Sequence, residues 1–203
     1  MIISPILPQI GDDLGIADAA LGTLVSVYSL MVGIFAILSG PVSDRIGRRR
    51  ILLIGCGTMT VALMLHTLVS DYASFLTVRV FAGMAGGILS GAAVSYIGDY
   101  FPYERRGWAT GWVMSGSALG QIAGIPIGIV LAGQWGFKAP FYIFAVTMAA
   151  TILLLFFRVP QPPGKQSLEQ LTVRKAAVDY AALLRRPEVA WAAVAYFVMF
   201  LGV

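Results

Sequence analysis

The chain has 203 residues, of which 58% are hydrophobic and only 12% are charged, and its mean hydropathy is +0.83. Soluble domains are about half apolar and about one quarter charged, so this composition excludes an ordinary soluble fold. A bilayer removes the difficulty because lipid replaces water around the apolar surface. The net charge of +4 does not indicate nucleic-acid binding, since the basic residues lie in short loops between apolar runs. We therefore expect an all-α integral membrane protein whose surroundings are the lipid bilayer, with no nucleic-acid partner.

Seven apolar segments follow one another along the chain, and the first and last are incomplete. Residues 2–10 are too few to cross about 30 Å of hydrocarbon at about 1.5 Å per residue. The seventh segment begins near Val189. The complete segments are residues 19–40, 51–69, 73–98, 108–132 and 139–157, each close to the ~20 residues that a spanning helix needs. We interpret the chain as part of a longer transporter, truncated at both ends.

Lysine and arginine gather after the second, fourth and sixth segments. They are Arg45, Arg48, Arg49 and Arg50, then Arg105 and Arg106, then Arg158, Lys165, Arg174, Lys175, Arg185 and Arg186. Two crossings separate each of these loops from the next, so all three face the same side, which the positive-inside rule makes cytoplasmic. We predict a six-span unit over 1–158, a cytoplasmic loop over 159–188 and the start of a seventh span over 189–203. Residues 167–184 are compatible with either a short amphipathic helix on the membrane or a flexible linker.

The loop after the second segment reads Gly40-Pro-Val-Ser-Asp44-Arg45-Ile-Gly47-Arg48-Arg49-Arg50. Gly40 and Pro41 are expected to end the helix, and Gly47 to permit the reversal of the chain. Asp44 lies near a helix C-terminus, where the macrodipole disfavours an acid. Such local conflicts often mark function. We expect its carboxylate to be satisfied by Arg45 and Arg48, or by the N-terminus of another helix.

This pattern resembles the signature between the second and third spans of the major facilitator superfamily. The resemblance implies a twelve-span fold of two six-span halves, each an inverted pair of three-helix repeats. The present chain would cover most of the first half. In that family the loop acts as a cytoplasmic gate, and its acid meets a helix N-terminus of the other half. By this resemblance the gate motif comprises Gly40, Asp44, Arg45, Gly47, Arg48 and Arg49, and its partner is a C-terminal half beyond Val203.

Arg79 lies about two turns inside the fourth segment, where a charged side chain costs several kcal/mol unless it reaches an interface or a polar cavity. Both interpretations stay open. Arg79 and Gly83 resemble the family's Arg-x-x-x-Gly motif, which implies a part in proton coupling, although Ala82 stands where the family often has Gln. His66, alone in the third segment, is expected to be a packing residue rather than a proton relay. The candidates for lining a polar cavity are Tyr28, Tyr96 and Gln121.

Small residues recur at every fourth position in two segments. They are Gly83, Gly87, Gly91 and Ser95 in the fourth segment, and Gly116, Gly120, Gly124 and Gly128 in the fifth. Such rows let helix backbones approach closely, so helix packing is their expected role. Gly111, Gly120, Gly124 and Pro126 also resemble the glycine-proline motif of the family's antiporter branch. The resemblance is imperfect because Ile125 separates Gly124 from Pro126.

The sequence contains no nucleophile elbow, no nucleotide-binding loop and no cluster of Cys and His. We therefore expect no enzyme activity, no metal and no cofactor, with a proton gradient as the energy source. The sequence predicts a multi-pass secondary transporter of a bacterial inner membrane that works by alternating access and exports a small-molecule substrate by proton antiport. The alternatives are an uptake symporter or facilitator for sugars or organic acids, and a non-transporting membrane module or remnant.

Overall fold

A computed structural model describes residues 3–162, 182 and 185–201. The chain divides into two compact units, Met1–Gln166 and Ser167–Val203, which are described separately. The amphipathic helix considered for residues 167–184 falls outside the described residues except for Ala182. The described part of the second unit is one apolar helix, α8 (Pro187–Leu201), with Glu188 in its first turn.

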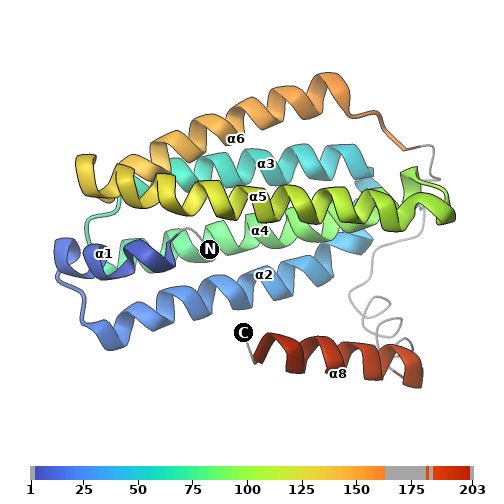
Figure 1. Cartoon of the computed structure of the whole chain (residues 1–203), viewed down its shortest axis with the longest axis horizontal. Coiled ribbons are helices and arrows are strands. Elements are labelled where there is room, and N and C mark those ends of the chain that lie inside the picture. The colour runs from blue at the N-terminus through green and yellow to red at the C-terminus, as the bar shows by residue number, and fades with distance from the viewer. Residues whose placement is uncertain (1–2, 163–181, 183–184, 202–203) are drawn as a thin grey trace. The chain divides into compact units, whose positions relative to one another are not determined.

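Six helices and one short 3-10 turn build the described part of the first unit. They are η1 (Ser4–Ile6), α1 (Leu7–Leu14), α2 (Asp18–Ile46), α3 (Arg48–His66), α4 (Tyr72–Tyr100), α5 (Tyr103–Trp135) and α6 (Ala139–Arg158). Within the described residues five helices, α2 to α6, are long and apolar enough to cross a membrane. Their axes run in broadly the same direction (Figure 1). The all-α membrane fold expected from composition is therefore confirmed.

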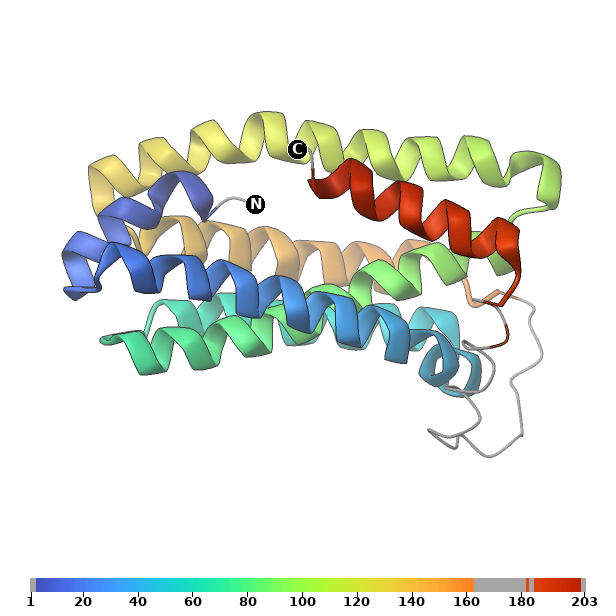
Figure 2. The ribbon, with the colours of Figure 1, turned by 90° about the horizontal axis from the view of Figure 1, so that it is seen from below.

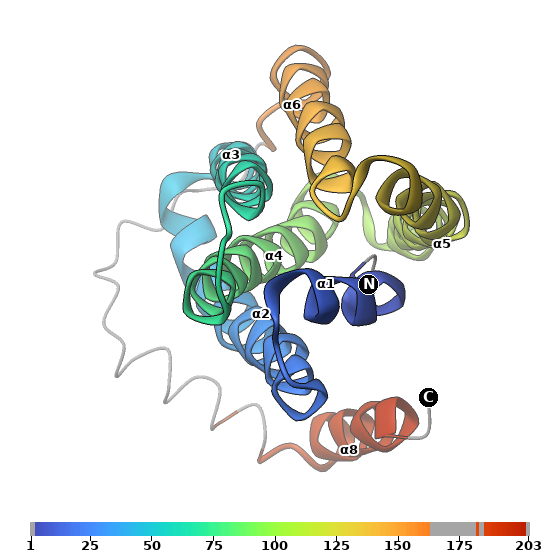
Figure 3. The ribbon, with the colours of Figure 1, turned by 90° about the vertical axis from the view of Figure 1, so that its left-hand side faces the viewer.

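Helix α4 lies at the centre of the packing. It contacts α2 and α3 along much of its length, and α3 in turn contacts α6. Figure 3 shows α4 between α2 and α3, with α6 at the top between α3 and α5. Helix α5 adjoins α4 and α6, and Figure 2 shows it running along one edge of the bundle. Gln9 of α1 donates to the carbonyl oxygen of Ala132 on α5 at 3.0 Å, which ties the first segment to the fifth helix.

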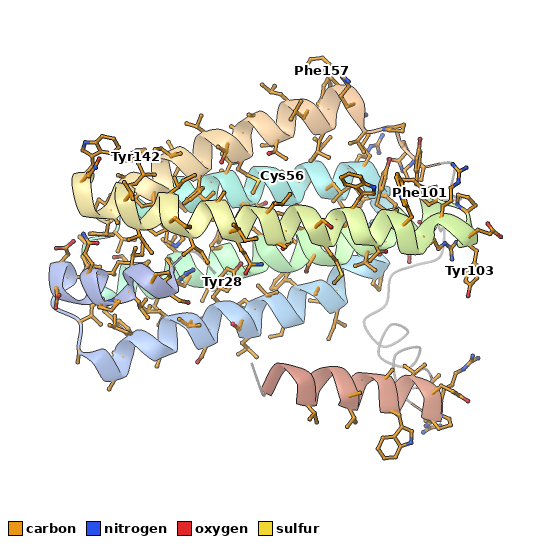
Figure 4. All side chains as sticks on the ribbon, viewed as in Figure 1. Tyr28, Cys56, Phe101, Tyr103, Tyr142 and Phe157 are labelled. Atoms are coloured by element: carbon orange, nitrogen blue, oxygen red, sulfur yellow. The ribbon has the colours of Figure 1, made fainter. Side chains whose placement is uncertain are left out.

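The bundle has two chemically different ends. The end that we call the arginine-rich end carries Arg45 to Arg50, Arg105, Arg106 and Arg158. Phe101 and Tyr103 lie at this end, whereas Tyr142 lies at the opposite end (Figure 4). Near the opposite end a buried apolar cluster joins η1, α1, α2, α4 and α6, with Ile10, Leu24 and Phe75 fully buried. Many large apolar side chains elsewhere point outward, as expected where lipid is the solvent.

One predicted helix boundary is wrong. Helix α2 does not end at Gly40 and Pro41 but continues to Ile46, with Pro41 inside it. A spanning helix tolerates an internal proline because neighbouring groups satisfy the freed backbone atoms. Next to this proline, the Arg48 guanidinium donates to the Gly40 carbonyl oxygen at 3.4 Å. Helix α5 extends beyond its apolar segment of residues 108–132. It begins at Tyr103, because Pro102 starts the helix as its N-cap, and Arg105 and Arg106 lie in its first turns.

Candidate functional site

A single residue, Gly47, separates α2 from α3. Its φ of +103° is a conformation that a side chain disfavours. Its N–H donates to the Ser43 carbonyl oxygen at 2.9 Å, and its own carbonyl oxygen accepts from the Ile51 N–H at 3.1 Å. Gly47 therefore ends one helix and begins the next. This reversal places Asp44, in the last turn of α2, beside Arg48, the first residue of α3.

Arg48 forms ion pairs with two acids. It pairs with Asp44 across the Gly47 turn and with Asp99 near the end of α4, where its Nε lies 2.5 Å from Oδ2. The Arg48 side chain is 15% exposed, against 48% for Asp44 and 37% for Asp99. The macrodipole conflict at Asp44 is thus resolved by an arginine. Arg45, the other partner considered, is exposed and makes no ion pair within the described residues.

The segment after α6 closes over the beginning of α3. Gln161 Oε1 accepts from the Arg49 backbone N–H at 3.2 Å, which satisfies one of the free donors at a helix N-terminus. The Arg49 guanidinium donates to the Phe156 carbonyl oxygen and lies 5.2 Å from the centre of the Phe156 ring. Tyr96 of α4 donates to the Pro160 carbonyl oxygen at 2.9 Å. Three helices therefore meet at the arginine-rich end through polar contacts.

Arg79 is buried inside the bundle, with 6% of its surface exposed. Its guanidinium carbon lies 4.9 Å from the centre of the Tyr28 ring and 5.9 Å from that of Phe75, distances typical of cation–π contact. Its Nε has no hydrogen-bond partner within the described residues. Of the two interpretations left open by the sequence, the structure favours the interior position over one at the membrane interface.

A cavity of about 260 Å³ lies beside Arg79. Its walls come from η1, α2, α3, α4 and α6, and its polar wall residues are Tyr28, His66, Arg79 and Thr147. Figure 4 shows Tyr28 on α2, in the middle part of the bundle. The other two cavity candidates lie elsewhere. Tyr96 is at the arginine-rich end, and Gln121 is exposed on α5, bonded to its own helix.

His66 lines the cavity beside Arg79, a position that the sequence did not predict. It is 1% exposed, stacks on Phe141 with ring centres 4.5 Å apart and meets the edge of Phe75 at 5.6 Å. Its Nδ1 lies 2.6 Å from the Ala62 carbonyl oxygen, while Nε2 has no partner within the described residues. His66 thus packs against Phe75 and Phe141, as expected of a packing residue. It also lines the same cavity as Arg79.

The two glycine rows lie in different surroundings. On α4, a Cβ added to Gly83 would lie 2.6 Å from the Tyr28 carbonyl oxygen, and one added to Gly87 would lie 2.5 Å from that of Val32. Helices α2 and α4 therefore touch through their backbones. On α5, a Cβ at Gly111, Gly116 or Gly120 would meet no described atom within 4 Å. The close packing expected at Gly116 and Gly120 is absent from the described part of the chain. Gly124 is buried, and α5 continues through Pro126.

The loop before α4 fixes the start of the helix that carries Arg79. Asp71 Oδ1 accepts from the Ser74 backbone N–H at 2.8 Å, and Ser74 Oγ accepts from the Asp71 N–H at 3.2 Å. This reciprocal arrangement is a capping box. The hydrogen bond from the Ser74 backbone N–H lowers the pKa of the Asp71 carboxyl below its ordinary value, because it favours the ionised form.

These features define a multi-pass helical membrane protein with a charged cluster at one end and a buried arginine inside the bundle. The sequence model of the Major Facilitator Superfamily matches residues 1–203. The chain therefore belongs to this family of membrane transporters, as the resemblance in the Gly47 loop predicted.

Named relatives and solved structures agree with this membership. The multidrug resistance protein MdtG of Serratia proteamaculans (strain 568) is 31% identical over 188 residues, which are 90% of this chain and 45% of MdtG. The uncharacterised transporter YceJ of Bacillus subtilis (strain 168) is 26% identical over 99% of this chain and 50% of YceJ. The chain thus spans about half the length of these relatives. The inward-open xylose transporter XylE of E. coli matches with a TM-score of 0.71 at 17% identity, over 94% of this chain and 49% of XylE, which shows the fold alone.

Proposed function

We propose that this chain belongs to a secondary active transporter that exports small molecules by proton antiport and works by alternating access. The observation that carries the proposal is the buried Arg79, whose Nε is unpaired within the described residues. A fixed positive charge inside a membrane protein stabilises the ionised form of any carboxylate that approaches it, so movement of such a carboxylate can be linked to proton release. The similarity to MdtG, a multidrug resistance protein, supports export as the direction.

The cluster at the arginine-rich end supports the conformational part of the proposal. Arg48 holds Asp44 and Asp99 together at the ends of α2 and α4, and both acids remain partly exposed. Exposed ion pairs are worth little individually, about 0–1 kcal/mol. A gate made of such pairs can therefore open and close at small energetic cost. In this proposal Asp44 takes part in closing the cytoplasmic side, and the bacterial inner membrane is the location.

The test uses the full-length protein in everted membrane vesicles energised by a proton gradient. The probe is ethidium, an amphipathic dye whose fluorescence reports its accumulation. We expect accumulation that stops when nigericin collapses the pH gradient, and that is lost in Arg79→Gln but retained in the control Arg106→Gln. Arg106 is a suitable control because it is exposed at the start of α5 and does not line the cavity.

Two results would contradict the proposal. Dye movement that is unaffected by both nigericin and Arg79→Gln would rule out proton coupling through this residue. Movement in the opposite direction, driven by the same gradient, would favour an uptake symporter.

A further inference from the structure

The cavity beside Arg79 combines three kinds of chemistry within one six-span unit. Arg79 supplies a cation, and its Nε lacks a partner within the described residues. The second polar group is His66. Because a carbonyl oxygen can only accept, the contact with Ala62 assigns the proton of a neutral imidazole to Nδ1, which leaves Nε2 as an acceptor. Phe141 and Phe144 supply aromatic surface.

Both polar groups are more than nine-tenths buried, with 6% of Arg79 and 1% of His66 exposed. Buried polar groups without a partner are costly, and a buried charge more so. Arg79 and His66 also lie around the same ring, since each contacts Phe75. Both residues also line the same cavity, His66 from α3 and Arg79 from α4, so a single ligand that fills the cavity can reach both.

We infer that this cavity is a binding site for a small aromatic hydroxy acid. The carboxylate of the ligand accepts from the Arg79 guanidinium, its hydroxyl donates to His66 Nε2, and its ring packs against Phe141 and Phe144. The volume fits this class. A cavity of about 150 Å³ holds benzene, so about 260 Å³ accommodates one ring with two polar substituents. The site lies within the first unit and does not depend on the direction or energy source of transport.

The test is equilibrium binding to the full-length protein, purified in detergent and measured without any gradient. The probes are 4-hydroxybenzoate, its positional isomer 3-hydroxybenzoate, benzoate, which lacks the hydroxyl, and 4-hydroxybenzamide, which lacks the charge. We expect the better hydroxybenzoate to bind at least tenfold more tightly than the amide, because hydrogen bonds to charged groups are stronger than neutral ones. Benzoate is expected to fall between them, since it leaves His66 Nε2 unsatisfied.

Two substitutions assign these differences to the cavity. Arg79→Gln should abolish the preference for acid over amide. His66→Phe keeps an aromatic ring between Phe75 and Phe141 but removes Nε2, so hydroxybenzoate and benzoate should then bind equally. Arg106→Gln, outside the cavity, should change neither preference. Met148→Trp, which fills the cavity from α6 without touching a charge, should weaken all the probes and provides a second test if Arg79→Gln does not fold.

The inference fails if the wild-type protein binds the amide as tightly as the acid, or binds none of the probes at millimolar concentration. It also fails if Arg106→Gln alters the preference as much as Arg79→Gln does. Because no gradient is present, a negative result in this experiment is independent of whether the protein couples transport to protons.

Discussion

The backbone contact between α2 and α4 makes a sharp prediction at Gly87. A Cβ at this position would lie 2.5 Å from the Val32 carbonyl oxygen and 2.8 Å from the Ala36 backbone nitrogen. Both are backbone atoms, so no side chain can rotate away. Restoring an ordinary 3.4 Å contact requires α2 to move away from α4 by about 0.9 Å. This movement would also loosen the contact between α2 and Gly83.

The size of the effect follows from two opposing terms. Alanine is favoured over glycine inside a helix by about 1 kcal/mol, whereas overpacking costs about 1–3 kcal/mol. Because the clash is with backbone, we take the upper end of the overpacking range, about 3 kcal/mol, and subtract the gain of about 1 kcal/mol in helix propensity. We therefore expect Gly87→Ala to lower the free energy of unfolding by about 2 kcal/mol. The measurement is the unfolding of the detergent-solubilised protein by heat or by titration with a denaturing detergent.

The same substitution elsewhere provides the control. Gly98 lies on the same helix, and Gly120 on α5, with no described atom within 4 Å of an added Cβ at either position. Gly98→Ala and Gly120→Ala should be neutral or slightly stabilising. If Gly87→Ala is as stable as these two variants, the close packing of α2 against α4 is wrong.

Three further predictions concern the ends of the helices. Gly47→Ala should destabilise the protein by about 1–2 kcal/mol, because its φ of +103° is strained for alanine; unfolding midpoints compared with Gly98→Ala will show this, and equal midpoints would contradict it. Arg48→Gln should cost about 1 kcal/mol, more at low salt than at high salt, because its two ion pairs are partly exposed; a loss independent of salt would exclude an electrostatic origin. The pKa of Asp71 is lowered in the folded protein, so the stabilisation from its ionised form should be complete above the ordinary carboxyl pKa of about 3.9 and should be lost as pH falls below it through the folded-state value. Asp71→Asn, which still caps the helix, should therefore flatten the acid side of the profile of stability against pH; an unchanged profile would contradict this.

Hydrophobic length was sufficient to predict the spans, because only a helix of about twenty apolar residues can cross a bilayer with its backbone satisfied. Helix boundaries were harder to predict from local signals. Gly40 and Pro41 are helix-ending residues in water, but the helix continues through them. The true boundary is Gly47, which the sequence predicted as the reversal. The difference arises because neighbouring groups in a membrane protein can satisfy the backbone around a proline.

Contacts between distant residues could not be predicted from one sequence. Asp99 lies 51 residues from Arg48, and Gln161 lies 112 residues from Arg49, so no local pattern marks either pair. A usable signal existed for Asp99, since acids are scarce in this chain and this one stands at the predicted cytoplasmic end of its span. The same limit applies to His66, whose neighbour Arg79 is on another helix.

The central helix joins the two features on which the proposals rest. Helix α4 carries Arg79 in its first half and Asp99 in its last turn, and between them Gly83 and Gly87 lock its backbone against α2. Helix α2 in turn carries Tyr28, beside Arg79, and Asp44, beside Arg48. Close-packed backbones do not slide continuously, because an intermediate position loses contact without gaining any. A force applied at the Arg48 cluster should therefore move α2 and α4 together, and the wall that these two helices give to the cavity would keep its shape.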